Sequence, residues 1–154
     1  MGLHLSDTSQ PLVLDFAGED LELTVNGEEV EPRLVANHVV IPTTLLREGA
    51  NAITASFRSR VAQTGTPLTR YLDRSDGEEY LYTLVVPADA HRLFPCLDQP
   101  DLKARYTLSL TTPAEWVAVA NGHETRSDDG QRARWEFSET APLPTYLFAF
   151  AAGP

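Results

Sequence analysis

The sequence has 154 residues, a formal net charge of −10 and 42% hydrophobic residues, which fits one domain that can bury a core. The excess of acidic residues gives no basis for binding nucleic acid or an anionic membrane. No apolar run approaches the ~20 residues of a membrane-spanning helix, and the amino terminus has no signal-peptide pattern. The single cysteine, Cys96, excludes an internal disulfide and favours a reducing cytoplasm.

The first sixty residues contain short runs in which apolar and polar side chains alternate, a pattern typical of antiparallel strands. Strands are predicted at residues 12–16, 21–25, 38–41 and 52–57, with a further short strand around Val30. Asn26-Gly27 predicts a tight hairpin, because both turn positions favour positive φ. From Ser59 to Gly77 the pattern lapses, which predicts a long connection over the surface.

The most distinctive stretch runs from Tyr80 to Lys103. It begins as a strand rich in aromatic and β-branched residues, which Pro87 ends because proline has no N–H for a ladder. Residues 88–94 predict a single helical turn. Pro95 and Pro100 then frame a stiff turn.

Four more strands are predicted, at residues 104–111, 116–120, 132–137 and 146–151. Asp129-Gly130 predicts a second hairpin, and the alternation points Trp135 and Phe137 inward. About ten short strands separated by turns predict an all-β fold, a mostly antiparallel β-sandwich or saddle-shaped domain with one or two short helical turns. Residues 1–154 are expected to form a single domain.

The same stretch carries a family resemblance. The matching residues are Tyr80–Thr83, Pro87–Ala90, Arg92, Phe94–Cys96, Asp98, Pro100, Leu102–Ala104, Pro113, Trp116, Val119–Asn121, Trp135, Phe137 and Thr145–Phe150. In this order and spacing they resemble the amino-terminal domain of the aminopeptidase N family of zinc metallopeptidases, the gluzincin class with an HExxH motif. The resemblance is dense from Gly65 onward and looser before it, and it implies the same saddle-shaped β-domain.

The catalytic machinery of that family does not occur in this chain. The four histidines are His4, His38, His91 and His123, and none has a second histidine four residues away, so no HExxH zinc site exists here. The Gly-x-Met-Glu-Asn substrate motif is also missing, since Met1 is the only methionine. We therefore predict no catalytic or metal-binding residue, and we expect the chain alone to be inert toward peptides and to bind no zinc stoichiometrically.

The resemblance implies a zinc ion and a peptide substrate in a missing catalytic domain of the same polypeptide, on which this domain docks. It also implies that the domain forms one wall of the S1 pocket, here Leu84, Val86 and Pro87. In the family, a Glu or Gln at the position of Val86 binds the α-ammonium of the substrate, and a Gln commonly occupies the position of Leu84. Valine can neither pair with an ammonium nor accept a hydrogen bond.

Three explanations for Val86 stay open. The catalytic domain could hold the ammonium alone, the amino-terminal specificity could differ, or the parent could be a non-catalytic relative that serves as a scaffold. A fourth interpretation makes Val86 an ordinary core residue and shifts the register to Val85, which is equally apolar.

Two further groups of residues match the family as framework or loop. Pro95, Cys96, Asp98 and Pro100 are predicted to be structural, with Cys96 buried and Asp98 accepting backbone N–H bonds. Gly65, Arg70 and Asp73 match a segment that approaches the active site in the family, although a solvated loop with local hydrogen bonds is the favoured interpretation of these residues.

The alternative function is a stand-alone β-sandwich that binds a protein or glycan without peptidase chemistry. A severed domain should expose a large apolar patch, whereas a self-sufficient module should be mostly polar outside. If the first strands of the family are missing before Leu12, an open sheet edge would allow the isolated fragment to dimerise.

Overall fold

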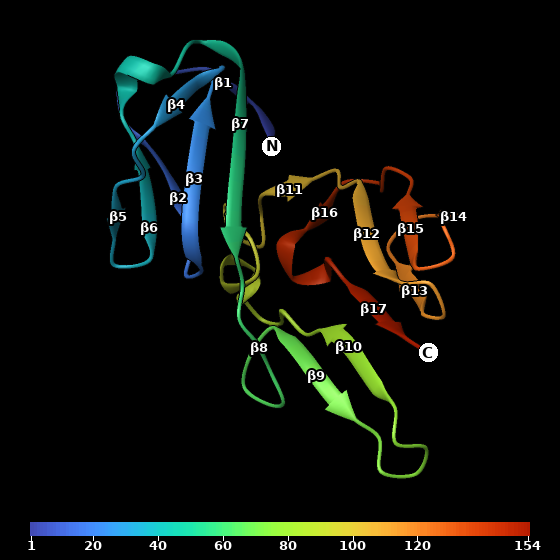
Figure 1. Cartoon of the computed structure of the whole chain (residues 1–154). Helices are drawn as coiled ribbons and strands as arrows, with labels where there is room; N and C mark the ends of the chain where they lie inside the picture. Colours follow the sequence, from blue (N-terminus) through green and yellow to red (C-terminus); the bar gives the residue numbers. More distant parts are fainter. The chain divides into compact units, whose positions relative to one another are not determined.

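The computed structural model describes all 154 residues, from Met1 to Pro154. Its regular elements are seventeen strands and three single-turn 3-10 helices, labelled β1–β17 and η1–η3 (Figure 1). The prediction of an all-β, mostly antiparallel fold is confirmed. The helical turns number three instead of the predicted one or two.

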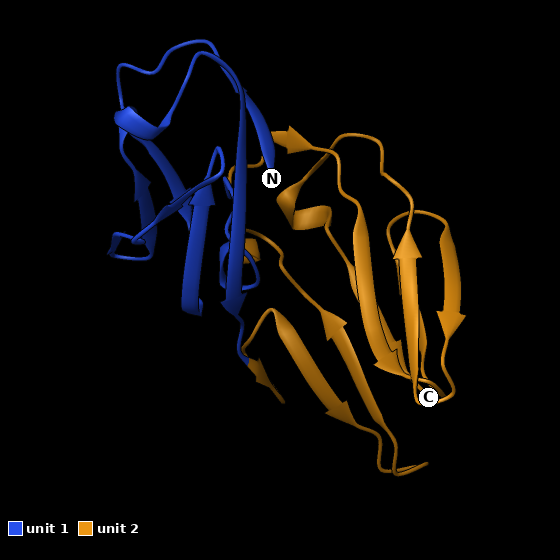
Figure 2. Ribbon diagram, turned by 45° about the horizontal axis from the view of Figure 1, so that its top comes forward, with its two compact units in different colours: residues 1–60, 91–98 blue, residues 61–90, 99–154 orange.

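The chain divides into two compact units, coloured separately in Figure 2. Unit 1 comprises Met1–Arg60 together with His91–Asp98, and unit 2 comprises Val61–Ala90 together with Gln99–Pro154. The segment His91–Asp98 therefore follows the first part of unit 2 in the sequence but packs with unit 1.

Unit 1 contains two sheets. One has the order β1-β7-β3-β4 and the other the order β2-β6-β5. Their strands are β1 (Gly2–Leu5), β2 (Leu12–Asp15), β3 (Glu19–Val25), β4 (Glu28–Val30), β5 (Leu34–Val35), β6 (His38–Ile41) and β7 (Gly49–Arg58), with η1 at Thr43–Leu45. The turn η2 (Ala90–Arg92) begins with the last residue of the first part of unit 2 and continues into unit 1.

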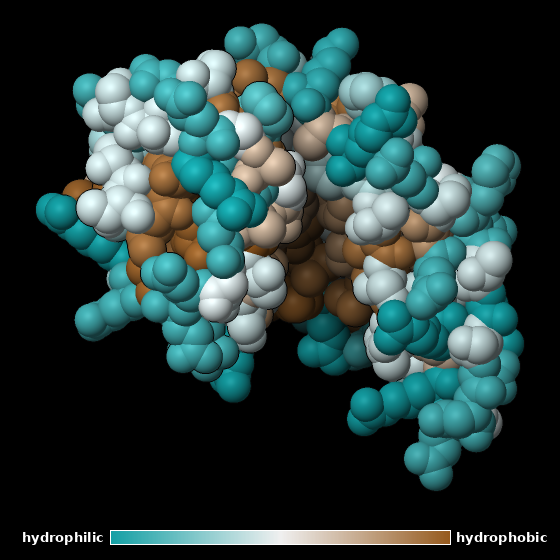
Figure 3. Space-filling view, turned by 90° about the horizontal axis from the view of Figure 1, so that it is seen from above, coloured by the Kyte–Doolittle hydropathy of each residue, from teal (hydrophilic) through white to brown (hydrophobic).

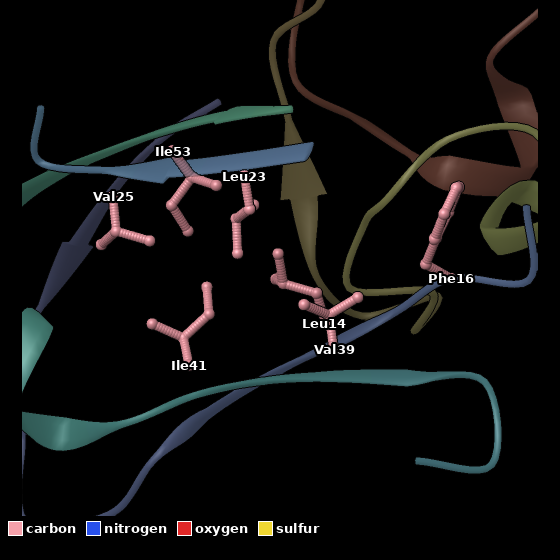
Figure 4. Packing of buried hydrophobic residues seen from close by; sticks show 7 residues of the cluster. All are labelled: Leu14, Phe16, Leu23, Val25, Val39, Ile41 and Ile53. Atoms are coloured by element: carbon pink, nitrogen blue, oxygen red, sulfur yellow. The ribbon is translucent and has the colours of Figure 1, made fainter. Parts of the chain in front are cut away.

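The core of unit 1 lies between these two sheets. Leu14, Val39 and Ile41 come from β2 and β6, and they face Leu23, Val25 and Ile53 from β3 and β7 (Figure 4). These residues alternate with less buried ones along each strand, so one face of each sheet is buried. Phe16 completes the cluster and stacks edge-on against Phe57, with ring centroids 5.3 Å apart.

Two tight turns with positive φ connect strands of unit 1. Asn26 (φ 51°) and Gly27 (φ 90°) join β3 to β4, as predicted. Ala36 (φ 50°) and Asn37 (φ 66°) join β5 to β6. This second hairpin was not predicted, because alanine gives no signal for a left-handed position.

Unit 2 contains three sheets, with the orders β13-β17-β10-β9-β8, β12-β15-β14 and β11-β16. Their strands are β8 (Val61–Ala62), β9 (Leu68–Leu72), β10 (Glu79–Thr83), β11 (Lys103–Ala104), β12 (Leu108–Pro113), β13 (Val117–Ala120), β14 (Glu124–Asp128), β15 (Arg132–Phe137), β16 (Leu143–Pro144) and β17 (Phe150–Gly153), with η3 at Thr145–Leu147.

The core of unit 2 lies between its two larger sheets. Ala118 on β13 and Ala152 on β17 pack against Ala133, Trp135 and Phe137 on β15. Trp135 and Phe137 are buried, as predicted. Because the five-stranded sheet presents alanines to this core, there is room for the two large aromatic side chains of the other sheet.

Four predictions of secondary structure were wrong. The strand predicted at residues 104–111 is two strands, because β11 ends at Ala104 and pairs with β16, whereas β12 begins at Leu108 and pairs with β15. The segment 59–77 is not a continuous loop, since it contains β8 and β9, and β8 pairs with β9 in parallel. The strand predicted through Val86 ends at Thr83. The last strand begins at Phe150, because residues Thr145–Leu147 form η3.

Candidate functional site

The candidate site lies where the chain leaves β10. Leu84 and Val86 are 60% and 56% exposed, whereas Val85 between them is 2% exposed. The interpretation of Val86 as a core residue is therefore wrong, and Val85 fills that role. The apolar side chains of Leu84 and Val86, two residues apart, therefore both point outward.

Backbone hydrogen bonds hold this segment in place. The N–H of Leu84 donates to the carbonyl of Pro67 at 2.7 Å, and the N–H of Asp89 donates to the carbonyl of Val85 at 2.9 Å. The Thr83 hydroxyl accepts the N–H of Phe150 at 2.9 Å and donates to its carbonyl at 3.2 Å. The segment also contains a cis peptide bond between Val86 and Pro87. The hydrogen bonds of Thr83, Leu84 and Val85 thus fix the backbone from which the side chains of Leu84 and Val86 project.

The chemistry of these side chains is limited to apolar contact. Neither Leu84 nor Val86 has a donor, an acceptor or a charge. They can exclude water and contact an apolar group, but they cannot satisfy an ammonium, which needs an anion or a strong acceptor when it is buried.

The Pro95–Pro100 turn is tied to the end of β2. Asp15 and Cys96 exchange two backbone hydrogen bonds, of 2.8 and 3.1 Å. The side chain of Cys96 is buried, and this burial, followed by the charges of Asp98 and Asp15, raises the pKa of its thiol. A buried thiol that stays protonated is a poor nucleophile, so Cys96 belongs to the framework of unit 1.

Two carboxylates organise the same turn. Asp98 is almost fully buried, and its Oδ2 accepts the N–H of His91 at 3.1 Å and lies 2.8 Å from the Nδ1 of His91. Its own N–H donates to Oδ2 of Asp15 at 2.9 Å, while Oδ1 of Asp15 lies 2.9 Å from Nδ1 of His38. The predicted role of Asp98 as an acceptor of a backbone N–H is confirmed.

The pairing of Asp15 with Asp98 was not predicted. The two residues lie 83 positions apart, and no local sequence pattern connects them. The only signal was the proline frame around Asp98, which indicates a fixed turn but does not identify its partner.

Arg70 and Asp73 make local contacts. Arg70 forms a two-pronged ion pair with Glu79 on the neighbouring strand, and this hydrogen bonding raises the pKa of the Arg70 guanidinium. Asp73 accepts the N–H and the hydroxyl of Ser75, which lowers the pKa of the Asp73 carboxyl. Arg70 is exposed and Asp73 is half-buried, and these contacts account for both residues without a ligand. Gly65 adopts a positive φ of 73°.

The histidines do not assemble into a metal centre. His38 and His91 each pair with one carboxylate, Asp15 and Asp98 respectively. No group of three or more His, Cys, Asp or Glu side chains in the chain is arranged to hold a metal ion. None of the helices is long and apolar enough to cross a membrane.

Comparison with known proteins adds independent evidence. The family model described as the peptidase M1 N-terminal domain matches residues 14–147. Aminopeptidase N of Streptomyces lividans is 31% identical over 133 residues, which are 86% of this chain and 15% of that protein. Glutamyl aminopeptidase of Bos taurus is 31% identical over 163 residues, covering 97% of this chain and 16% of that protein.

Two solved structures share the fold. Yeast LTA4 hydrolase superposes with a TM-score of 0.76 at 23% identity, covering 97% of this chain and 24% of that chain. The M1 zinc metallopeptidase of Deinococcus radiodurans superposes with a TM-score of 0.67 at 24% identity, covering 95% of this chain and 35% of that chain. The present chain thus spans only about 15% of the length of the curated relatives described above.

Proposed function

The chain belongs to the peptidase M1 N-terminal domain family, and from this we propose that it is the non-catalytic amino-terminal domain of a zinc aminopeptidase. In this proposal Leu84, Val86 and Pro87, called the substrate wall below, form one wall of the S1 pocket. The domain docks on a catalytic domain of the same polypeptide, and that domain carries the zinc ion and the hydrolytic chemistry.

One observation carries the proposal. Leu84 and Val86 project from a hydrogen-bonded backbone at the end of β10, on either side of the buried Val85. A side chain that contributes to a binding site must be exposed and must have a fixed position. The similarity to named aminopeptidases supports the assignment of this exposed pair to a peptide-binding site.

The zinc ion itself does not fit this chain. Two of its four histidines are each occupied by a carboxylate, and no three potential ligands lie together. We therefore place the metal in the catalytic domain. The contribution of the present chain to the reaction is limited to contacts with the substrate.

The experiment that tests the substrate wall is Val86→Glu in the full-length protein. A carboxylate at this exposed position would pair with the α-ammonium of the substrate, and such charge-assisted bonds contribute roughly 1.5–3 kcal/mol. We expect kcat/KM for aminoacyl para-nitroanilides to rise about tenfold. Val13→Glu, at an exposed valine of unit 1, adds the same charge elsewhere and should leave kcat/KM unchanged. If Val86→Glu behaves like this control, Val86 is not part of the wall.

A further inference from the structure

The five-stranded sheet of unit 2 has two faces of different character. Its register places Ala118, Ala152 and Leu81 in one row across β13, β17 and β10. The two alanines of this row pack on Trp135 and Phe137 in the core. The neighbouring row, Val119, Ala151 and Tyr82, therefore points away from the core.

This outward face carries no charged side chain. Directly paired residues share a face, so its members are Ala62, Thr69, Tyr71, Tyr80, Tyr82, Val117, Val119, Ala151 and Gly153. The whole chain contains 22 acidic and 12 basic residues. An uncharged face over all five strands of one sheet is therefore a distinct feature of the surface.

Large apolar side chains of this face are accessible. Val119 is 59% exposed, Tyr71 50% and Tyr82 39%. Gly153 leaves space for an aromatic ring, because a Cβ at this position would lie 2.4 Å from Cδ1 of Tyr80. Tyrosine rings offer a flat contact surface at a small cost in side-chain entropy.

The uncharged face continues directly into the substrate wall. Tyr82 lies two residues before Leu84, a distance of about 7 Å along an extended backbone. Thr83 and Val85, the residues in between, turn the other way: Thr83 binds the backbone of Phe150, and Val85 is buried. Tyr82, Leu84 and Val86 are thus successive outward side chains.

We propose that Tyr82 extends the substrate wall and is a specificity-determining residue, and that the substrates are peptides whose side chains at the wall are apolar or aromatic. The inference rests on the proposed function, since it takes Leu84 and Val86 as part of the wall. A charged side chain that moves from water onto this surface loses hydration without gaining a partner. An apolar side chain gains free energy in proportion to the area it buries.

The test uses the full-length protein and four substrates, the para-nitroanilides of leucine, phenylalanine, lysine and glutamate. The wild type should prefer leucine and phenylalanine. Tyr82→Glu should lower the ratio of kcat/KM for leucine to that for lysine by about tenfold, because the new carboxylate pairs with the lysine ammonium. Tyr82→Phe keeps the ring and should keep the ratio. Tyr71→Glu, which adds the same charge to the same face away from the wall, should also leave it unchanged.

The outcomes separate the two proposals. If the wild type hydrolyses none of the four substrates, the proposed function fails, and this inference fails with it. If the wild type is active but prefers lysine or glutamate, or if Tyr82→Glu leaves the ratio at its wild-type value, only the role of Tyr82 is overturned. If Tyr82→Glu does not fold, Tyr82→Ala decides: a higher KM for the phenylalanine substrate than in Tyr82→Phe supports the contact, and an equal KM overturns it.

Discussion

The two units bury apolar side chains in different ways. Unit 1 encloses seven residues, six of them large aliphatic side chains, and four of the seven have no exposed surface. The core cluster of unit 2 consists of three alanines and two aromatic residues, while Val117, Val119, Tyr71 and Tyr82 remain exposed on the other face of its main sheet.

This difference shows that hydrophobic composition alone does not decide which part of a protein is self-sufficient. Unit 1 buries seven large apolar residues in its own core, while Val13, Leu34 and Val35 stay exposed. Unit 2 keeps Tyr71, Tyr82, Val117 and Val119 exposed on one face of a single sheet. The space-filling view in Figure 3 shows hydrophobic surface beside strongly hydrophilic regions on one side of the molecule. Exposed apolar surface that is not needed for folding is available for a binding partner.

The largest effect on stability is expected when a side chain in the core of unit 1 is shortened. Leu14→Ala removes a side chain with no exposed surface and should lower the free energy of unfolding by about 2–5 kcal/mol. Val119→Ala, on the open face of unit 2, should change it by less than about 0.5 kcal/mol. Urea unfolding followed by circular dichroism measures both. Equal losses would mean that the outward face of unit 2 is as tightly packed as the core of unit 1.

A substitution in the β5–β6 hairpin of unit 1 is expected to raise the free energy of unfolding, by less than Leu14→Ala lowers it. Ala36 has a φ of 50°, a conformation that costs a residue with a Cβ about 1–2 kcal/mol. Ala36→Gly removes this cost but adds freedom to the unfolded chain, so we expect a net stabilisation of about 0.5–1 kcal/mol. Ala52→Gly, at an exposed position of β7, should instead destabilise the protein. Loss of stability in Ala36→Gly would contradict the strained turn.

The smallest effect concerns the β14–β15 turn of unit 2. The backbone N–H groups of Arg132 and Gln131 donate to Asp129, at 2.8 and 2.9 Å, and lower the pKa of its carboxyl from 3.8. Because the folded-state pKa is depressed, the stabilisation is complete above pH 3.8 and is lost as the pH falls through the lower folded value.

Asp129→Asn tests this dependence. The variant should be less stable than the wild type at neutral pH, and the difference should vanish in strong acid, where the wild-type carboxyl is protonated. Asp101→Asn controls for the loss of one exposed negative charge. A difference that persists unchanged into acid would show that the carboxylate charge does not stabilise this turn.

The fold class and most strands follow from the alternation of apolar and polar residues, and the family resemblance inferred from the sequence is confirmed by the match over residues 14–147. Turns with a glycine were predictable, at Asn26-Gly27 and at Asp129-Gly130. The Ala36-Asn37 turn was not predictable from the sequence. Alanine rarely adopts a left-handed conformation, and here the pairing of β5 with β6 holds it there.

The other features that the sequence analysis did not predict have a common physical cause. Strand β9 carries Thr69 and Arg70 among its apolar residues, so pairing with β10 determines its structure more than its own pattern does. Sequence alternation shows that Leu84 and Val86 share a side of the backbone, but tertiary packing decides which side is buried. For the same reason, the outward face with Tyr82 and Val119 could not be identified from the sequence. It is defined only once the opposite face of the sheet is seen to pack on Trp135 and Phe137.

The passage of residues 91–98 from unit 2 into unit 1 has a consequence for the order of folding during synthesis. Cys96 and Leu97 pack with the first sixty residues of unit 1, yet the ribosome adds thirty residues of unit 2 between Arg60 and His91. Unit 1 therefore cannot complete its contacts until the nascent chain has passed Asp98. Because domains generally fold as units during synthesis, we expect the first part of unit 2 to leave the ribosome before unit 1 has all the residues of its fold.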